Sequence, residues 1–315
     1  MRRMVTVQRL SNAITDLAPW RDRRRIGFMH IPRTSGTSLV EAIGGRMRVG
    51  RSAYAFDRTL FGDFDRFDQF ERPLRTLIHL DTSALPRRAD FLAGHMACST
   101  LLAAGRDTLM TVLREPRSRL LSHWMFWRNH SDGELASLGA WGDRVGLAGR
   151  PLAGFLCRPE IACQTDNIAV RMLLSPHPLI PRDDFIDPAA DTVLLEAALS
   201  MLDRFAFADL LENPVLHRNL VAWLARPIGY ERRNESRPML PGRATSLSRE
   251  MTTTAVRLLA DRCRLDRVLW THVAIRRLGG NGAAALRDLA ERDGLRRAAS
   301  LLDTAAPARP ARQAA

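Results

Sequence analysis

Short apolar runs separated by amphipathic segments mark the first two thirds of the chain. Residues 26–31 (IGFMHI) and 109–113 (LMTVL) are mostly apolar, which is typical of strands buried on both faces of a parallel sheet. Residues 90–93 are a shorter candidate, and residues 74–80 and 205–208 are weaker ones. Strands that alternate with helical segments predict an α/β domain with a parallel sheet.

Helical periodicity dominates the C-terminal half. Proline suits the first turn of a helix, so Pro116 is expected to open one that runs to about Arg128. Beyond Pro188, apolar residues recur at helical spacing in four segments: 189–202, 214–225, 248–262 and 265–278. The expected fold class is therefore α/β, a P-loop-like parallel sheet flanked by helices with a mostly helical C-terminal half.

The pattern divides the chain into three parts. Residues 1–24 mix polar and apolar positions and are expected to form an N-terminal arm, and residues 25–280 form the main domain, in which 46–70 is irregular. After Gly280 the sequence turns to Ala, Arg and Pro, so residues 281–315 are expected to be a frayed tail.

Charge adds one constraint. The formal net charge of the 315 residues is +13, and all 47 basic residues are arginine. A basic chain favours anionic ligands such as nucleotides, acidic glycans or lipid headgroups. Nucleic acid is an unlikely partner, because the arginines are spread along the chain and not gathered into one basic helix or arm.

Nothing in the sequence indicates export or a metal centre. The 4 cysteines (Cys98, Cys157, Cys163 and Cys263) form neither a CxxC pair nor a zinc-like spacing. No apolar run approaches the length of a membrane span, and the N-terminus lacks the apolar centre of a signal peptide. The expected location is the cytoplasm, with no metal cofactor.

The first candidate site lies where the strand at 26–31 passes into a helix. The segment HIPRTSGTSL, residues 30–39, places a glycine and several hydroxyl side chains at a helix N-terminus, where backbone N–H groups bind anions. It is not a Walker A loop, since GxxxxGK[ST] is not present. The alternative interpretation is an ordinary capped helix.

The second candidate site repeats this arrangement in TVLREPRSRLLSHW, residues 111–124. A strand ends at Leu113, Arg114 follows, and Pro116 opens a helix. An arginine and helix N–H groups then face the same place and favour a second phosphate. Alternatively, Arg114 forms a salt bridge with Asp107 or Glu115.

Together the two segments resemble the nucleotide-binding motifs of the PAPS-dependent sulfotransferases, where PAPS is 3′-phosphoadenosine 5′-phosphosulfate. The nearest branch includes the heparan sulfate 2-O-sulfotransferases and bacterial relatives. PRTSGTS resembles the 5′-phosphosulfate loop PKTGGTS, with arginine for lysine at 33 and Ser35 for a smaller residue. The resemblance implies that the 5′ side is bound by Arg33, Thr34, Ser35, Gly36, Thr37 and Ser38. RxPxxRxxS is the 3′-phosphate motif, and it assigns that phosphate to Arg114 and Ser122.

The general base is expected at the end of another strand. His95 follows the run FLAGH, at the carboxyl end where open α/β sheets place their sites. The resembled branch has a Gly-His pair here, matched by Gly94 and His95, and its histidine is the proposed base. The alternative is that His95 is a histidine buried in the core with no catalytic role. His30 and His123 are expected to be structural.

The resemblance implies an activity. A sulfuryl group would pass from PAPS, as co-substrate and without a metal, to a hydroxyl of an acceptor. Arg33 and His95 would be the catalytic residues, and the acceptor class would be a glycan or glycolipid. The sequence identifies neither the acceptor nor the adenine contacts.

Weaker matches cover other parts of the domain. Asp166, Asn167 and Arg171 lie in a segment similar to one in the bacterial relatives and could serve the acceptor, or they form a capped helix with surface charges. Arg233 and Asn234 are weak candidates near the cofactor. Trp124 and Trp127 could stack on adenine, but their helical spacing favours the core.

Two other classes stay open at this stage. A P-loop-type kinase predicts a Walker lysine and a magnesium-binding acid, and neither is evident. A basic nucleotide- or nucleic-acid-binding protein without activity would show steep salt dependence of binding.

Overall fold

A computed structural model describes the chain over five ranges: residues 24–46, 51–79, 81–86, 88–229 and 237–303. Residues 1–23 of the expected arm, the candidates Arg233 and Asn234, and the last residues of the expected tail lie outside these ranges.

A five-stranded sheet forms the centre of the protein, and every strand pair in it is parallel. The strand order is β2-β3-β1-β4-β5, so β1 lies in the middle. The strands are β1 Ile26–Met29, β2 Ser52–Phe56, β3 Phe91–His95, β4 Thr108–Leu113 and β5 Phe207–Leu210. Three of the predicted runs, 26–31, 90–93 and 109–113, are confirmed as β1, β3 and β4.

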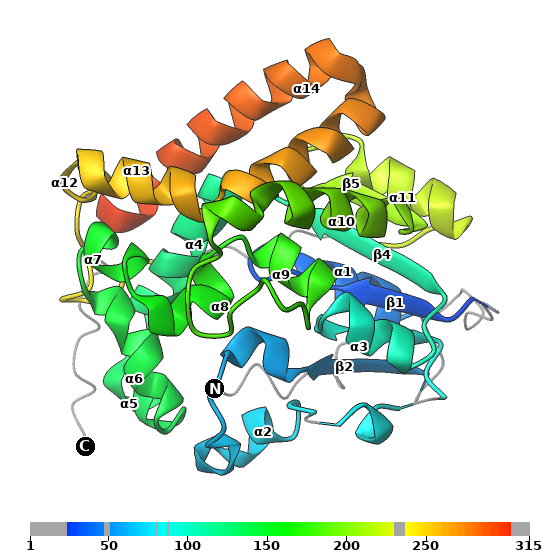
Figure 1. The fold of residues 1–315 in the computed structure, drawn as a ribbon, viewed down its shortest axis with the longest axis horizontal. Coiled ribbons are helices and arrows are strands. Elements are labelled where there is room, and N and C mark those ends of the chain that lie inside the picture. Colours follow the sequence, from blue (N-terminus) through cyan, green and yellow to red (C-terminus); the bar gives the residue numbers. More distant parts are fainter. Residues whose placement is uncertain (1–23, 47–50, 80, 87, 230–236, 304–315) are drawn as a thin grey trace, which may run out of the picture.

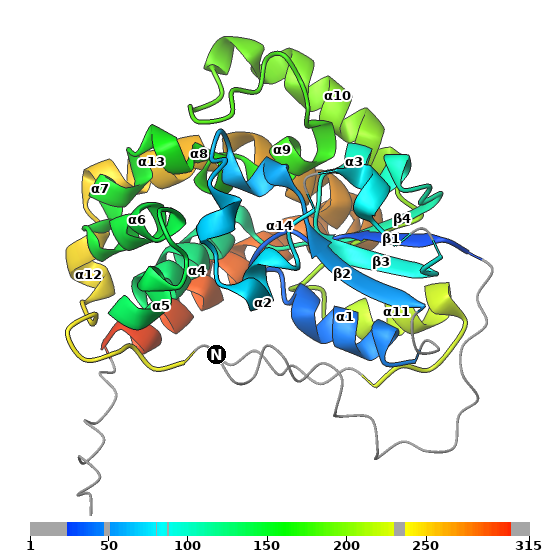
Figure 2. The same ribbon diagram turned by 90° about the horizontal axis from the view of Figure 1, so that it is seen from below.

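Helices cover both faces of the sheet, which is why its strands are apolar on both sides. Helices α1 (Gly36–Gly44) and α11 (Leu216–Leu224) lie on one face, where Ile26 and Phe28 of β1 pack against them. On the other face, Met29 joins a larger core that the remaining helices enclose. Figure 2 shows α3, α9 and α10 on that side.

The C-terminal half of the chain is mostly helical, as predicted, and further helices lie between the strands of the first half. The bounds of the remaining helices are α2 Arg72–Arg75, α3 Cys98–Ala103, α4 Pro116–Arg128, α5 Asp132–Ala136, α6 Trp141–Gly146, α7 Leu152–Leu156, α8 Ala162–Thr165, α9 Ile168–Leu174, α10 Asp191–Asp203, α12 Leu247–Glu250, α13 Thr253–Arg262 and α14 Arg264–Asp303. Among the described residues, no helix is both long enough and apolar enough to cross a membrane.

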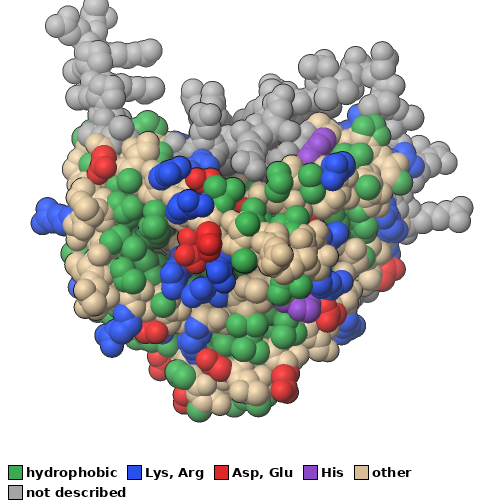
Figure 3. Space-filling view, turned by 90° about the horizontal axis from the view of Figure 1, so that it is seen from above, with side chains coloured by type: hydrophobic (Ala, Val, Ile, Leu, Met, Phe, Trp, Pro, Cys, Tyr) green, Lys and Arg blue, Asp and Glu red, His purple; other side chains and the backbone are tan. Residues whose placement is uncertain are grey.

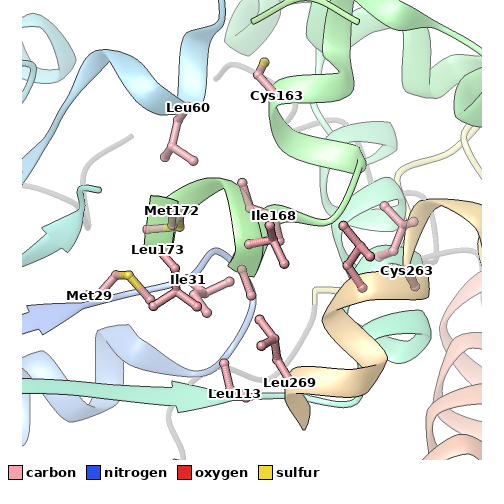
Figure 4. Packing of buried hydrophobic residues seen from close by; sticks show 14 of the residues in the cluster. Met29, Ile31, Leu60, Leu113, Cys163, Ile168, Met172, Leu173, Cys263 and Leu269 are labelled. Atoms are coloured by element: carbon pink, nitrogen blue, oxygen red, sulfur yellow. The ribbon is translucent and has the colours of Figure 1, made fainter. Parts of the chain in front are cut away.

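Helix α9 lies at the centre of the larger core. Figure 4 shows Ile168, Met172 and Leu173 of α9 packed over the end of β1, with Leu113 and Leu269 close by on the same side. All of these side chains are almost fully buried. The core therefore joins the ends of β1 and β4, where both candidate motifs begin, to the C-terminal helices.

Two sequence interpretations in the N-terminal half are wrong. Residues 74–80 do not form a strand: α2 ends at Arg75, and Ile78 makes only a single bridge to Phe56. The edge strand β2 lies inside the stretch 46–70 that was expected to be irregular. Its half-exposed side chains lack the continuous apolar run of a central strand, so the pattern gave only a weak signal.

The C-terminal predictions need smaller corrections. Segment 248–262 is divided into α12 and α13, and β5 starts two residues after the predicted 205. Helix α14 continues past Leu278 to Asp303, with non-helical dihedral angles at Gly279 (φ 74°, ψ 172°). Residues 281–303 are therefore not frayed. Their small and apolar side chains recur at helical spacing and are buried: Ala283, Leu286, Ala290, Ala298 and Leu302.

Candidate functional site

The loop between β1 and α1 has the backbone of an anion-binding site. Arg33 and Ser35 have positive φ angles of 70° and 59°, whereas Thr34 and Gly36 do not. Alternation of this kind turns successive N–H groups toward one concave side, and such concavities bind anions. Positive φ at two non-glycine residues is uncommon and costs free energy, and such residues cluster at functional sites.

Gly36 is required by a side chain that lies under the loop. A Cβ atom at position 36 would be 2.0 Å from Cδ2 of His30, so no larger residue fits. His30 is itself almost fully buried and stacks on Phe28. The expectation that His30 is structural is consistent with this packing, and the ring supports the loop from below.

The hydroxyl groups of the loop do not all face outward. The Thr34 hydroxyl donates a hydrogen bond to the carbonyl oxygen of Ile31 at 2.8 Å and is buried, so it closes the turn. Ser38 is also buried, whereas Thr37 is exposed. Ser35 makes no side-chain cap to α1. Backbone N–H groups, and the hydroxyls of Ser35 and Thr37, are therefore the donors best placed for a ligand.

The second motif begins at the end of β4 and continues into α4. Glu115 caps this helix, since its carboxylate accepts the backbone N–H groups of Arg117 and Ser118 at 3.1 and 2.7 Å. The N–H group of Glu115 donates to the carboxylate of Glu212 at 2.9 Å. Because these N–H groups are already bonded, a phosphate at this helix would depend on side chains, mainly Arg114 and Ser122.

The structure brings the two motifs into contact. The Arg33 Nε donates to the Ser122 hydroxyl at 3.2 Å, and the Arg114 guanidinium donates to the Arg33 carbonyl oxygen at 3.2 Å. The Arg33 guanidinium also lies 4.6 Å from the ring centre of the exposed Phe126. Arg114 thus bonds to the loop, not to Asp107 or Glu115. One continuous site therefore contains both candidate phosphate positions.

Positive charge is concentrated in this site. Burial lowers the pKa of Arg33 to about 10, and the charges of Arg114, Arg297 and Arg119 act in the same direction. Burial also lowers the pKa of Arg114, with further lowering by Arg297 and Arg119 that Glu212 opposes. With a pKa of about 10, Arg33 still carries its charge at neutral pH. Their mutual repulsion would be relieved by a bound anion.

A small cavity lies behind the loop. It has a volume of about 10 Å³, and its lining includes Thr34, Arg114, Arg119 and Asp266. That volume admits a single water molecule and no nucleotide. The buried Arg119 has no hydrogen-bond partner for its Nε and one Nη atom, so it contributes charge from beneath the site.

His95 ends β3, the strand next to β1, and is partly exposed. Its Nδ1 lies 2.6 Å from the carbonyl oxygen of His30. A carbonyl oxygen can only accept, so Nδ1 carries the proton and Nε2 has the free lone pair of a base. Burial lowers the pKa of His95 to about 4, and the charge of Arg33 contributes to this lowering. Gly94 is required because a Cβ atom there would lie 1.8 Å from the Ala55 carbonyl oxygen.

Sequence reasoning missed Tyr54, which links the histidines. Its hydroxyl lies 3.0 Å from Nδ1 of His30 and 3.4 Å from Nε2 of His95. Phe56 stacks on the His95 ring with centroids 5.0 Å apart. Both aromatic residues come from β2. The signal that could have identified them is the alternation Tyr-Ala-Phe, residues 54–56, typical of a half-buried strand.

Other candidates belong to the interior. Trp124 and Trp127 are buried in the core, as their spacing favoured. His123 is buried against Trp127, and neither of its ring nitrogens has a partner, which agrees with its expected structural role.

Asp166, Asn167 and Arg171 form a buried connection, not an acceptor surface. Arg171 donates to the Asp166 carboxylate at 2.8 Å, and Asn167 accepts the N–H group of Leu265 at 2.8 Å. All three side chains are almost fully buried, so the alternative of surface charges is also incorrect. They attach α9 to the start of α14.

No group of three or more histidine, cysteine or carboxylate side chains in the described ranges could hold a metal ion. Comparison with protein-family models, curated proteins and solved structures finds no significant match to the chain. The site must therefore be interpreted from its geometry and from the two motifs.

Proposed function

We propose that the protein transfers a sulfuryl group from PAPS to an acceptor hydroxyl. The observation that carries the proposal is the junction of the two motifs, in which Arg33 of the loop bonds to Ser122 of α4 and Arg114 bonds back to the loop. A phosphate site at the loop and a second one at α4 match a nucleotide with phosphates at its 5′ and 3′ positions. His95 lies at the end of the strand next to β1.

Each candidate residue would have a separate role in the transfer. His95 Nε2 would take the proton of the acceptor hydroxyl as its oxygen attacks the sulfur. The bond between sulfur and the bridging oxygen breaks, and 3′-phosphoadenosine 5′-phosphate (PAP) leaves. Arg33 and the loop N–H groups would stabilise the charge that develops on that oxygen. The proton, the broken bond and the leaving group of this step are all accounted for without a metal ion.

The acceptor class rests on the resemblance alone, which favours a glycan or a glycolipid. The surface is consistent with such a ligand. The face in Figure 3 intersperses acidic and basic side chains and shows no continuous basic stripe of the kind that tracks nucleic acid.

The direct test of the proposal is nucleotide binding and transfer. Titration calorimetry with PAP in the presence of a chelator is expected to show micromolar affinity, and labelled sulfate should pass from PAPS to material in a cell extract. Binding of ATP that requires magnesium, with no binding of PAP, would instead indicate a kinase and overturn the proposal.

Arg114→Ala is expected to weaken PAP binding by about ten- to a hundredfold, because a charge-assisted pair with phosphate is lost. Ser122→Ala should weaken it less, since a neutral hydroxyl contributes less. Both changes should weaken binding of adenosine 5′-phosphosulfate much less, since it lacks the 3′-phosphate and feels only the loss of the bonds that Arg114 and Ser122 make to Arg33. Calorimetry with both nucleotides checks this, and equal losses for the two would assign Arg114 to the 5′ side.

The transfer rate is expected to be insensitive to pH between 7.5 and 5.5. A base with the low pKa of His95, about 4, stays unprotonated across this window, so kcat/KM for PAPS should be flat. If the base were an ordinary histidine with a pKa near 6.5, kcat/KM would fall about tenfold over the same range. The acid limb of kcat should lie at higher pH than that of kcat/KM, because bound phosphosulfate offsets the charge of Arg33. Circular dichroism at each pH verifies that the protein stays folded.

A further inference from the structure

The C-terminal half of α14, residues 281–303, packs on the helix that carries the second motif. The Ser118 hydroxyl donates to the carbonyl oxygen of Ala290 at 3.3 Å. A Cβ atom at Gly294 would lie only 1.9 Å from the same hydroxyl oxygen, so the glycine permits a close approach of the two helices. Figure 2 shows this part of α14 beside α4.

Charge and burial hold the segment in this position. Glu291 lies 4.0 Å from Arg117 of α4 and 3.9 Å from Arg267 in the first half of α14. Ala298 and Leu302, one and two turns beyond Gly294, are buried in the larger core. The contact therefore continues along the helix and is not confined to one point.

This contact brings the turn of α14 that contains Arg297 close to the start of α4. Arg297 is exposed and follows Gly294, the residue packed on Ser118, by one helical turn of about 5.4 Å. Ser118 is in turn one helical turn from Ser122 and four residues from Arg114, which precedes the helix. The electrostatics agree with the packing. The charge of Arg297 contributes to lowering the pKa of both Arg33 and Arg114.

We propose that Arg297 binds the 3′-phosphate of the nucleotide together with Arg114 and Ser122, so that the C-terminal half of α14 is part of the nucleotide site. The inference rests on the proposed function. It assigns a role to a segment of the chain that lies outside both motifs, and it adds a third side chain to the phosphate contacts that α4 alone would provide.

The test compares two neighbouring arginines. Arg297→Ala is expected to weaken PAP binding about tenfold or more in calorimetry, and Arg297→Lys should retain most of the affinity because the charge is kept. Arg296→Ala is the matched control, since Arg296 is exposed like Arg297 and pairs loosely with Asp293 at 3.8 Å, whereas only Arg297 contributes to the lowered pKa of Arg33 and Arg114. Adenosine 5′-phosphate, which has no 3′-phosphate, should bind all four proteins alike.

The outcomes separate the inference from the function on which it rests. Wild-type protein that binds PAP while Arg297→Ala binds it equally well would overturn the role of Arg297 and leave the sulfotransferase proposal standing. Equal losses for PAP and adenosine 5′-phosphate would also overturn the assignment to the 3′-phosphate. Failure of the wild-type protein to bind either nucleotide would refute the proposed function itself, and the inference with it.

Discussion

Replacing His95 with alanine is expected to lower the turnover of sulfuryl transfer by about 10²–10⁴-fold, the range for loss of a general base. Affinity for PAP should stay nearly unchanged, because His95 bonds to the backbone carbonyl of His30 and to none of the side chains assigned to the phosphates. The physical reason is the tautomer. With Nδ1 bonded to a carbonyl oxygen, Nε2 is the only ring atom that can take a proton. Steady-state rates with saturating PAPS and calorimetry with PAP measure the two quantities.

A second histidine variant serves as the control. His177 bonds only locally, to the N–H group of Leu179 at 3.2 Å, so His177→Ala should keep full activity. An unaltered rate in folded His95→Ala protein would remove His95 from the mechanism and leave Tyr54, its neighbour at 3.4 Å, as the next group to examine.

Replacing Arg33 with alanine is expected to cost about 2–3 kcal/mol of transition-state stabilisation, roughly 30- to 150-fold in rate, the scale of removing one preorganised donor. Arg33 is held by Ser122 and Phe126, so its guanidinium is already positioned before the nucleotide binds. Some loss of PAP affinity should accompany the loss of rate, because the same charge faces the product phosphate.

The variant Arg33→Lys separates the contribution of the positive charge at position 33 from the contribution of the guanidinium geometry. Lysine keeps the charge but loses the bond from Nε to Ser122 and part of the contact with Phe126, so most activity should remain. Equally mild effects of alanine and lysine on rate would show that Arg33 points away from the reacting oxygen.

The two strand–loop–helix junctions could be predicted from the sequence because each is local. The apolar runs at 26–31 and 109–113 predict buried strands, and a glycine with hydroxyl residues or a proline marks the helix that follows. Strand, loop and helix are contiguous in each motif, so neighbouring residues suffice to define the geometry. The same holds for Gly94 and His95 at the end of β3.

Contacts between segments that are far apart in the sequence could not be predicted from local patterns. The bond between Arg33 and Ser122 depends on the strand order, which places β4 directly beside β1. Tyr54 reaches His95 only because β2 pairs with β3, and a half-exposed edge strand has a weak pattern. Asp166 and Arg171, charged residues that suggested a surface, are buried because each satisfies the other.

The sequence by itself determined the α/β class, the two strand–loop–helix junctions and the strand end that carries His95, because periodicity and turn chemistry act within a few residues. Only the tertiary structure decided which of these groups meet and how the arginines come together. Residues 281–303 are the clearest case. Their alanines and glycine were interpreted as a frayed tail because they carry little apolar surface, yet these small side chains allow the close packing on α4 that brings the turn with Arg297 near the site. Packing of this kind depends on the shape of the partner helix, which no local pattern contains.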